Sequence, residues 1–466
     1  MVGYFRINDP YRLVGLLVIM ALLSLPLFID TPDVTVTELK SFVIGERVND
    51  GYGLYHGTID STPPLTAWCY GLFDMVFGRS LTGRHLLAFI ILFIQSAFLG
   101  IILIDKKVIT ENTYIPSLLF SLLAFISFDS IALTGDLLAF GVLLLALNNL
   151  IKEIEFRTPR DETSFNLGIF ISLASMFSFS YIIYLPGAII ILSIFTRSTI
   201  RKYLLVVFGF LLPHLLLICI FNLNGHAGEL WQNYYVHNFS FPANDLISTK
   251  SLALLCTVPL FYLFVSLFIL NRDARLTKYQ SQVFQMMFLW FVIAFVQFFI
   301  AADFRPQSII TVLPPVSFFL THFLLLIRRR RFVEMNALIL IVGIVVLAYL
   351  TRYQKIPQIN FSDLIVKKNP LPIQNKKILV LADDQSIFLK NTLGSPFFDW
   401  DLAAPVFTQP DYYENLLLVY RCFEKEKPEV IIDPQNHMAA FFGRMPQLKK
   451  LYVKSKEGYR LRKINS

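Results

Sequence analysis

The chain of 466 residues carries little charge, because Asp, Glu, Lys and Arg together make up only 16% of it. An ordinary soluble protein has about 25% charged residues, so the composition excludes a soluble enzyme. There are only four cysteines, at positions 69, 219, 256 and 422, and no two of them form a Cys-x-x-Cys pair. Neither a disulfide framework nor a zinc site is therefore encoded. The sequence also lacks a phosphate-binding loop, a dinucleotide fingerprint and a hydrolase elbow.

Apolar residues dominate what is present: 55% of the chain is hydrophobic, 45 residues are Phe, and the mean hydropathy is +0.59. A membrane core about 30 Å thick needs about 20 apolar residues per helix. Eleven segments come close enough to count as spans, at residues 13–29, 84–104, 114–128, 137–151, 166–179, 181–196, 203–222, 251–271, 283–301, 307–327 and 333–351. We therefore predict an α-helical polytopic membrane protein with about 11 transmembrane helices.

The basic residues cluster in alternate connections, from Arg6 and Arg12 before the first span to residues 328–331 before the last. The short intervening connections, at residues 129–136, 180, 222–250 and 302–305, hold only Lys250 and Arg305. Basic residues accumulate on the cytoplasmic side of membrane proteins, so this asymmetry predicts a cytoplasmic N-terminus and a retained first span. It also accounts for the net charge of +8 without a nucleic-acid partner.

An odd number of spans places residues 352–466 on the outer face, which is periplasmic if the membrane is a bacterial inner membrane. The runs KILVLAD and PEVIID are typical of buried parallel strands, and they flank the helical run NLLLVYRCFEKEK. We predict a small α/β domain here, following a transmembrane domain at residues 1–351. Its 18 basic and 12 acidic residues form either a solvated surface or one that attracts lipid phosphate or a polyanionic acceptor.

The first outer loop, residues 30–83, is too polar to span the membrane and too apolar to be a plain linker. Two segments in it, TVTELKSFVIGERV and PPLTAWCYGLFDMVFG, have the pattern of interfacial helices. We expect the first of them to lie flat with Glu38 and Lys40 near the lipid headgroups. Such helices would hold carboxylates at the boundary of water and lipid, above a cavity.

Short motifs follow one another along this loop and beyond it: Thr37-Glu38, the run DGYGLY at residues 50–55, Asp60 before Pro63-Pro64, Trp68, Phe77-Gly78, Arg84, Asp136 and the run FRPQSIITVLPP from residue 304. Their order resembles the GT-C superfamily of polyprenyl-phosphate-dependent glycosyltransferases, especially the branch of protein mannosyltransferases and aminoarabinose transferases. The resemblance covers about the first 330 residues. It implies a GT-C-like fold that moves a sugar from a polyprenyl phosphate to a lipid, glycan or protein on the outer face.

Such a transfer needs a base for the acceptor and a cation for the departing phosphate. The resemblance assigns catalytic roles to Glu38 and Asp136, and donor phosphate binding to Arg84, Arg305 and His56. It makes Asp60 and Asp129 candidates for binding substrate or a divalent cation. The family usually has Asp where this chain has Thr37, which leaves Glu38 as the candidate base.

Each of these residues also has an ordinary interpretation. Glu38 can be a solvated acid, Asp60 a turn former, and His56 a loop histidine. Arg84 and Arg305 can extend to lipid headgroups.

Two functions stay open at this point. The first is a glycosyltransferase whose partners are a polyprenyl-linked sugar and membrane lipids. The second is a non-catalytic GT-C-like subunit that serves assembly or secretion, with a protein partner at residues 352–466. A secondary transporter is less consistent with the chain, because charged residues avoid the middle of the spans and no inverted repeat is evident.

Overall fold

A computed structural model describes residues 2–155, 161–196, 199–242, 244–273, 276–367 and 371–462. The chain forms two compact units. The first comprises Met1–Val34, Ser80–Leu217 and Phe241–Ile365, and the second comprises Thr35–Arg79, Ile218–Ser240 and Val366–Ser466. The last four residues of the predicted C-terminal domain, 463–466, lie outside the described ranges. The second unit thus combines most of the first outer loop with the C-terminal segment, and the predicted boundary at residue 351 stays a prediction.

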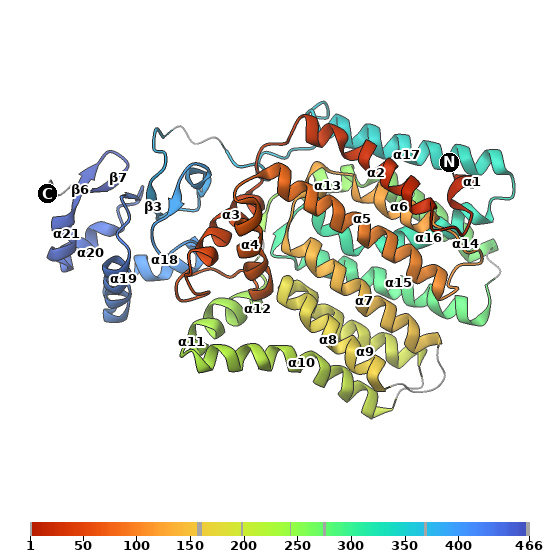
Figure 1. Ribbon diagram of the computed structural model, residues 1–466, viewed down its shortest axis with the longest axis horizontal. Helices are drawn as coiled ribbons and strands as arrows, with labels where there is room; N and C mark the ends of the chain where they lie inside the picture. Colours follow the sequence, from red (N-terminus) through yellow and green to blue (C-terminus); the bar gives the residue numbers. More distant parts are fainter. Residues whose placement is uncertain are drawn as a thin grey trace. The chain divides into compact units, whose positions relative to one another are not determined.

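The first unit consists almost entirely of helices (Figure 1). Its α-helices are α1 (Val2–Phe5), α2 (Arg12–Ile29), α5 (Leu81–Asp105), α6 (Ile115–Ala124), α7 (Gly135–Glu155), α8 (Asp161–Phe177), α9 (Tyr184–Phe195), most of α10 (Ile200–Leu223), α13 (Thr249–Leu255), α14 (Thr257–Asp273), α15 (Lys278–Phe299), α16 (Leu313–Leu326) and α17 (Arg330–Arg352). Three 3-10 helices, η1 (Phe128–Ile131), η2 (Phe179–Ile183) and η4 (Pro306–Thr311), lie between them. A short parallel pair of strands, β1 (Asn244–Asp245) and β2 (Asp303–Phe304), completes this unit.

All eleven predicted segments contain helix in the described ranges. Six helices are long and apolar enough to cross a membrane by length and composition, namely α2, α5, α7, α10, α15 and α17. A seventh candidate is the pair α13 and α14, which is bent by 63° at Cys256. The remaining predicted segments form shorter helices of 10 to 17 residues, α6, α8, α9 and α16. The predicted class, an α-helical polytopic membrane protein with a small C-terminal α/β region, is confirmed.

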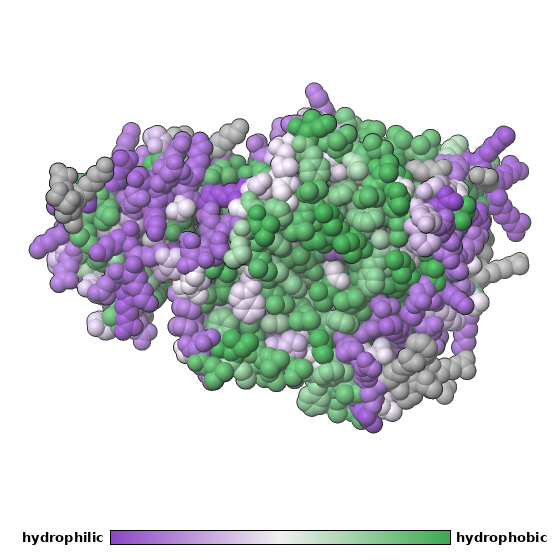
Figure 2. Space-filling model, in the orientation of Figure 1, coloured by the Kyte–Doolittle hydropathy of each residue, from purple (hydrophilic) through white to green (hydrophobic). Residues whose placement is uncertain are grey.

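Apolar side chains are exposed along the outermost helices, as expected for lipid contact. Val14, Val18 and Leu22 of α2 are each more than half exposed, and so are Leu338 and Ile339 of α17. In Figure 2 the helices of this unit carry a broad green surface of such residues. A contiguous apolar surface of this kind would be unfavourable in water, whereas a bilayer solvates it.

In the second unit, two helices from the first outer loop pack on each other, α3 (Val36–Asn49) and α4 (Pro64–Phe77). Their backbones approach closely at Gly45, where an added Cβ would lie 2.6 Å from the carbonyl oxygen of Tyr70. Both predicted helices are confirmed, but the alternative interpretation of Glu38 as a solvated acid is wrong. Glu38 is only 5% exposed and Arg47 is 3% exposed, because protein covers this helix on several sides.

The C-terminal segment forms a five-stranded sheet in the order β4-β3-β5-β7-β6. The strands are β3 (Lys377–Val380), β4 (Thr392–Leu393), β5 (Val430–Ile432), β6 (Tyr452–Ser455) and β7 (Gly458–Leu461). The predicted strands β3 and β5 are parallel neighbours, and β7 pairs antiparallel with β5. The 3-10 helix η5 (Ser386–Leu389) and the helices α18 (Trp400–Thr408), α19 (Tyr413–Lys425), α20 (Met438–Arg444) and α21 (Pro446–Leu451) accompany the sheet.

The core between the sheet and these helices contains Leu379, Phe407, Phe423 and Phe441, all fully buried. The connection that follows α10 completes the second unit with α11 (Ala227–Glu229), the π-helix η3 (Leu230–Val236) and α12 (His237–Phe239).

Candidate functional site

The residues predicted to form the site are divided between the two units. Arg84, Asp129, Asp136 and Arg305 belong to the first unit, and Glu38, His56 and Asp60 belong to the second. Both arginines are only 2% exposed, so neither guanidinium extends to lipid headgroups. The alternative interpretation of these arginines is therefore wrong.

Asp136 and Arg305 form a buried ion pair in the first unit. Asp136 lies in the first turn of α7, where a carboxylate is favoured by the helix dipole. Its Oδ2 accepts a hydrogen bond of 2.9 Å from Nη2 of Arg305 and one of 3.3 Å from the Ser308 hydroxyl. Burial lowers the pKa of Arg305, but the carboxylates of Asp136 and Asp303 outweigh that effect and raise it above its ordinary value. The Arg305 guanidinium therefore stays protonated at physiological pH.

Gln307 connects the Arg305 segment to the segment of Asp129. The Gln307 backbone N–H donates to Oδ2 of Asp129 at 2.9 Å, and its side-chain amide donates to the carbonyl oxygens of Ser130 and Ala132. The hydroxyl of Thr134 in turn donates to Oε1 of Gln307 at 2.7 Å. These bonds hold η1 against η4, so Asp129 has a structural role alongside its predicted one.

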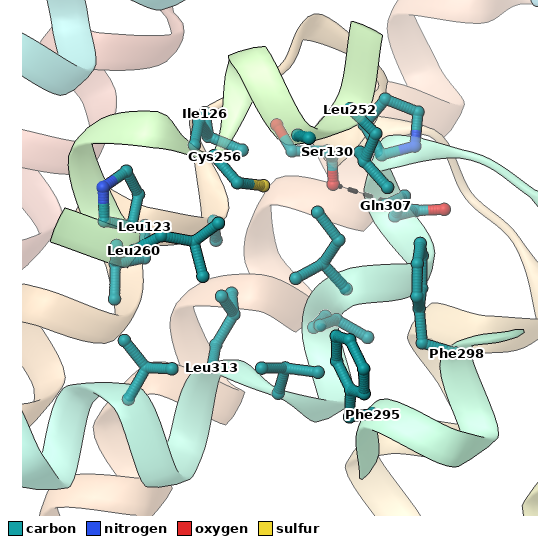
Figure 3. Close-up of a pocket in the computed structure, with 18 of the residues that line it drawn as sticks. Leu123, Ile126, Ser130, Leu252, Cys256, Leu260, Phe295, Phe298, Gln307 and Leu313 are labelled. Atoms are coloured by element: carbon teal, nitrogen blue, oxygen red, sulfur yellow. Dashed lines mark hydrogen bonds between the residues drawn. The ribbon is translucent and has the colours of Figure 1, made fainter. Parts of the chain in front are cut away.

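An apolar cavity of about 350 Å³ opens beside this polar cluster (Figure 3). Its wall is formed by aliphatic and aromatic side chains of α5, α6, α13, α14, α15 and α16, among them Leu260, Phe295 and Leu313. Cys256, at the bend between α13 and α14, points into it (Figure 3). Ser130, Thr249 and Gln307 are its lining residues with a hydroxyl or amide, and the Gln307 amide donates to the Ser130 carbonyl oxygen in the hydrogen bond drawn in the figure. The cavity is thus apolar along most of its wall and polar at one edge.

Glu38, the candidate base, is engaged in capping α3. Its Oε2 accepts hydrogen bonds from the backbone N–H of Thr35 at 2.9 Å and from the Thr35 hydroxyl at 2.8 Å. The Thr35 hydroxyl also accepts from the Glu38 backbone, which completes a capping box. Thr37, which stands where the family has Asp, is buried and has its hydroxyl 3.3 Å from that of Thr35. The catalytic role of Glu38 stays a prediction.

Asp60 is paired with a lysine. Its Oδ1 lies 3.0 Å from Nζ of Lys40, and its Oδ2 accepts from the backbone N–H of Thr62 at 2.7 Å. Within the described ranges, no three His, Cys, Asp or Glu side chains come together in a way that could hold a metal ion. An ammonium group beside Asp60 and a backbone donor on Asp129 do not fit a divalent-cation site, so we retain these residues only as candidates for binding substrate.

His56 stacks on the imidazole of His226, with ring centroids 3.6 Å apart and planes inclined by 5°. Its Nδ1 is 3.1 Å from the carbonyl oxygen of Leu54, and Glu229 lies 3.6 Å from His226. Burial and the neighbouring His226 lower the pKa of His56. A neutral, stacked imidazole is a poor partner for a phosphate, and the predicted phosphate contact stays a prediction.

Several residues that shape these groups were not predicted from the sequence. Gln307 follows Arg305 within the same motif, so its position offered a weak signal. Arg47 bonds the carbonyl oxygen of Gly57 at 2.6 Å and the carboxylate of Glu426 at 2.8 Å, linking the loop to the C-terminal segment. That pair is separated by 379 residues, and nothing local in the sequence indicates it.

The two units thus present different chemistry. The first unit provides an apolar cavity, an amide and hydroxyl at its edge, and a nearby buried cation that is already balanced by a carboxylate. The second unit provides the carboxylates of Glu38 and Asp60, and the Asp60 carboxylate is paired with the Lys40 ammonium. An amphipathic ligand matches the first arrangement, and a group with hydroxyl or amine donors matches the second.

The fold is that of an α-helical polytopic membrane protein and can be compared with solved structures. The structure is similar to that of ArnT from Cupriavidus metallidurans bound to undecaprenyl phosphate, with a TM-score of 0.57, 12% identity, and coverage of 86% of this chain and 89% of ArnT. The apo state of ArnT gives a TM-score of 0.55 with 13% identity, covering 85% of this chain and 88% of ArnT. ArnT is a GT-C aminoarabinose transferase, so the predicted GT-C-like fold is confirmed. No family model and no curated protein sequence matches the chain significantly.

Proposed function

We propose that this protein is a membrane glycosyltransferase that moves a sugar from a polyprenyl-phosphate carrier to an acceptor on the outer face. The observation that carries the proposal is the cavity of the first unit, which is apolar along its wall and polar at Ser130 and Gln307. A polyprenyl phosphate has the same division into a long apolar chain and a polar head. The structural likeness to ArnT bound to undecaprenyl phosphate supports this choice of ligand.

In this proposal the cavity holds part of the polyprenyl chain, and the carrier phosphate exchanges with Asp136 as the partner of Arg305. A guanidinium can bind phosphate through two parallel hydrogen bonds, and the adjacent carboxylate would then be released toward the reacting groups. Arg84 is a second candidate for the phosphate. Asp60 and Glu38 would receive the acceptor, whose hydroxyl or amine must lose a proton during transfer.

We further propose a bacterial inner-membrane location, with the N-terminus in the cytoplasm and residues 352–466 in the periplasm. Membrane lipids surround α2 and α17 in this arrangement.

Carrier binding tests the proposal directly. Purified full-length protein is incubated with undecaprenyl phosphate and examined by native mass spectrometry, alongside Cys256→Trp, which fills the cavity. The matched control is Phe264→Trp in the adjoining helix α14, because Phe264 is 73% exposed and does not line the cavity. We expect the control to bind like the wild type and Cys256→Trp to bind at least tenfold more weakly. Absence of carrier from the wild type, or equal binding by both variants, would overturn the cavity assignment.

The second candidate is a non-catalytic GT-C-like subunit that acts through its C-terminal domain. Thr37 in place of Asp, and the use of Glu38 in a capping box, favour it. It predicts that a protein copurifies in stoichiometric amount, and that Glu38→Gln and Asp136→Asn leave the cellular function intact. The glycosyltransferase proposal predicts loss of function in both variants and release of undecaprenyl phosphate from a lipid-linked sugar by the wild type.

A further inference from the structure

The C-terminal segment pairs with the loop that carries Asp60, within the second unit. The backbone N–H of Ile59 donates to the carbonyl oxygen of Pro396 at 2.7 Å, and the N–H of Asp399 donates to the carbonyl oxygen of Ile59 at 3.2 Å. Ile59 and Phe397 form a parallel bridge between these hydrogen bonds. The pairing fixes the register of Asp399 relative to Asp60, although 339 positions separate them in the chain.

Side-chain bonds extend this pairing. The Ser61 hydroxyl donates to Oδ2 of Asp399 at 3.2 Å, and Oδ1 of Asp399 caps α18 by accepting from the backbone N–H of Asp401 at 3.1 Å. On the other side, Lys40 of α3 is paired with Asp60. Two carboxylates and one ammonium group, supplied by three separate segments, therefore face one another.

The charges around Asp399 act in both directions. Burial raises its pKa, Lys40 lowers it, the Asp60 carboxylate raises it again, His237 lowers it and Asp401 raises it, with a net increase over the ordinary value. Lys40 contacts Asp60 directly and lies close enough to Asp399 to lower its pKa, so its ammonium is near both carboxylates. Neutralising either aspartate therefore changes the electrostatic environment of the Lys40 ammonium.

We propose that Asp399 is a positioning residue for the Asp60–Lys40 pair. Its carboxylate competes with that of Asp60 for the Lys40 ammonium, and so determines how far Asp60 is available to a hydroxyl or amine of the acceptor. This role rests on the proposed function in one respect, namely that Asp60 contacts the acceptor. It gives the C-terminal segment a direct part in the site, beyond that of an attached domain.

The test follows Lys40 itself. Lysines of the full-length protein are reductively methylated with ¹³C, which keeps their charge, and their methyl groups are observed by NMR. The Lys40 signal is assigned from its loss in Lys40→Arg. On acidification we expect the Lys40 signal to shift with a midpoint above about 3.9, the ordinary value for Asp. Asp399→Asn should abolish the part of the shift whose midpoint lies above about 3.9. It should keep the cap on α18, because Asn caps helices as well as Asp does. Asp60→Asn should keep the step but move it to lower pH, since a neighbouring negative charge is removed.

Asp401→Asn is the matched control, because this exposed neighbour carries the same charge without facing the Ser61 hydroxyl, and it should retain the step. Persistence of the step in Asp399→Asn, or its absence from the wild type, would overturn the proposal. Thermal unfolding of each variant shows that it is folded. Undecaprenyl phosphate binding by the wild type is measured separately, so failure of the proposed function and failure of the positioning role give different results.

Discussion

Nη2 of Arg305 lies 2.9 Å from Oδ2 of Asp136, and both side chains are buried in the first unit. The resemblance had given these residues separate roles, one toward phosphate and one in catalysis. Their pairing means that neither acts without a change in the other. A ligand phosphate that binds Arg305 must compete with a carboxylate that is already in place.

Removing one partner of this pair should lower the free energy of unfolding more than removing both. Arg305→Ala leaves a buried carboxylate without its counter-charge, and we expect the free energy of unfolding to fall by about 3 kcal/mol. The double variant Asp136→Asn with Arg305→Gln has no buried charge and should lose less than Arg305→Ala. Thermal unfolding in detergent measures the wild type, Arg305→Ala, Arg305→Gln, Asp136→Asn and the double variant. Additive losses would show that the two residues are not coupled.

The approach of α3 to α4 depends on Gly45. Gly45→Ala places a Cβ 2.6 Å from a backbone oxygen of Tyr70, which cannot swing away as a side chain would. We expect a loss of about 1–3 kcal/mol in the free energy of unfolding. Gly443→Ala in α20 is the control, because no atom lies within 4 Å of its added Cβ, and helix propensity predicts a gain of about 0.5–1 kcal/mol. Equal stability of the two variants would contradict the close packing of these helices.

Acidification should destabilise the second unit through the stacked histidines. The pKa of His56 is lowered in the folded state, so the unfolded chain binds more protons as the pH falls below about 6.5. The contribution of His56 to stability is therefore complete above that value and decreases as the pH falls toward the lowered pKa. The unfolding midpoint should be lower at pH 5.5 than at pH 7.5, and the difference should shrink in His226→Gln. If the two unfolding midpoints differ as much in His226→Gln as in the wild type, groups other than the stacked histidines cause the effect. His437→Gln serves as the control.

Glu38 can be tested for catalysis apart from its structural role. Glu38→Gln keeps a side chain that suits a capping box, so its unfolding midpoint should stay near that of the wild type. Thr35→Ala removes the cap and should cost about 1 kcal/mol. If Glu38 is the base, Glu38→Gln loses release of undecaprenyl phosphate from a lipid-linked sugar by at least a hundredfold. If a folded Glu38→Gln protein still releases undecaprenyl phosphate, the base is a residue other than Glu38.

Much of the local structure was predictable from the sequence. The helices α3 and α4 follow from apolar spacing and from the prolines at positions 63 and 64, and β3 and β5 follow from short runs rich in Val, Ile and Leu. These signals are local, because a helix or strand is selected by residues within a few positions of one another. The burial of Glu38 could not be predicted in this way, because periodicity describes one helix and not what covers its polar side.

The partners of the site residues could not be predicted in the same way. Asp136 meets Arg305 across 169 positions, and Ser61 meets Asp399 across 338. The sequence determined that this protein is a polytopic α-helical membrane protein and predicted its GT-C-like fold, because hydropathy, charge asymmetry and motif order are properties of the chain itself. Only the tertiary structure decided which charges neutralise each other and that the C-terminal segment holds the Asp60 loop. Those pairings arise from packing between distant segments, since a buried charge is stable only beside the partner that the fold brings to it.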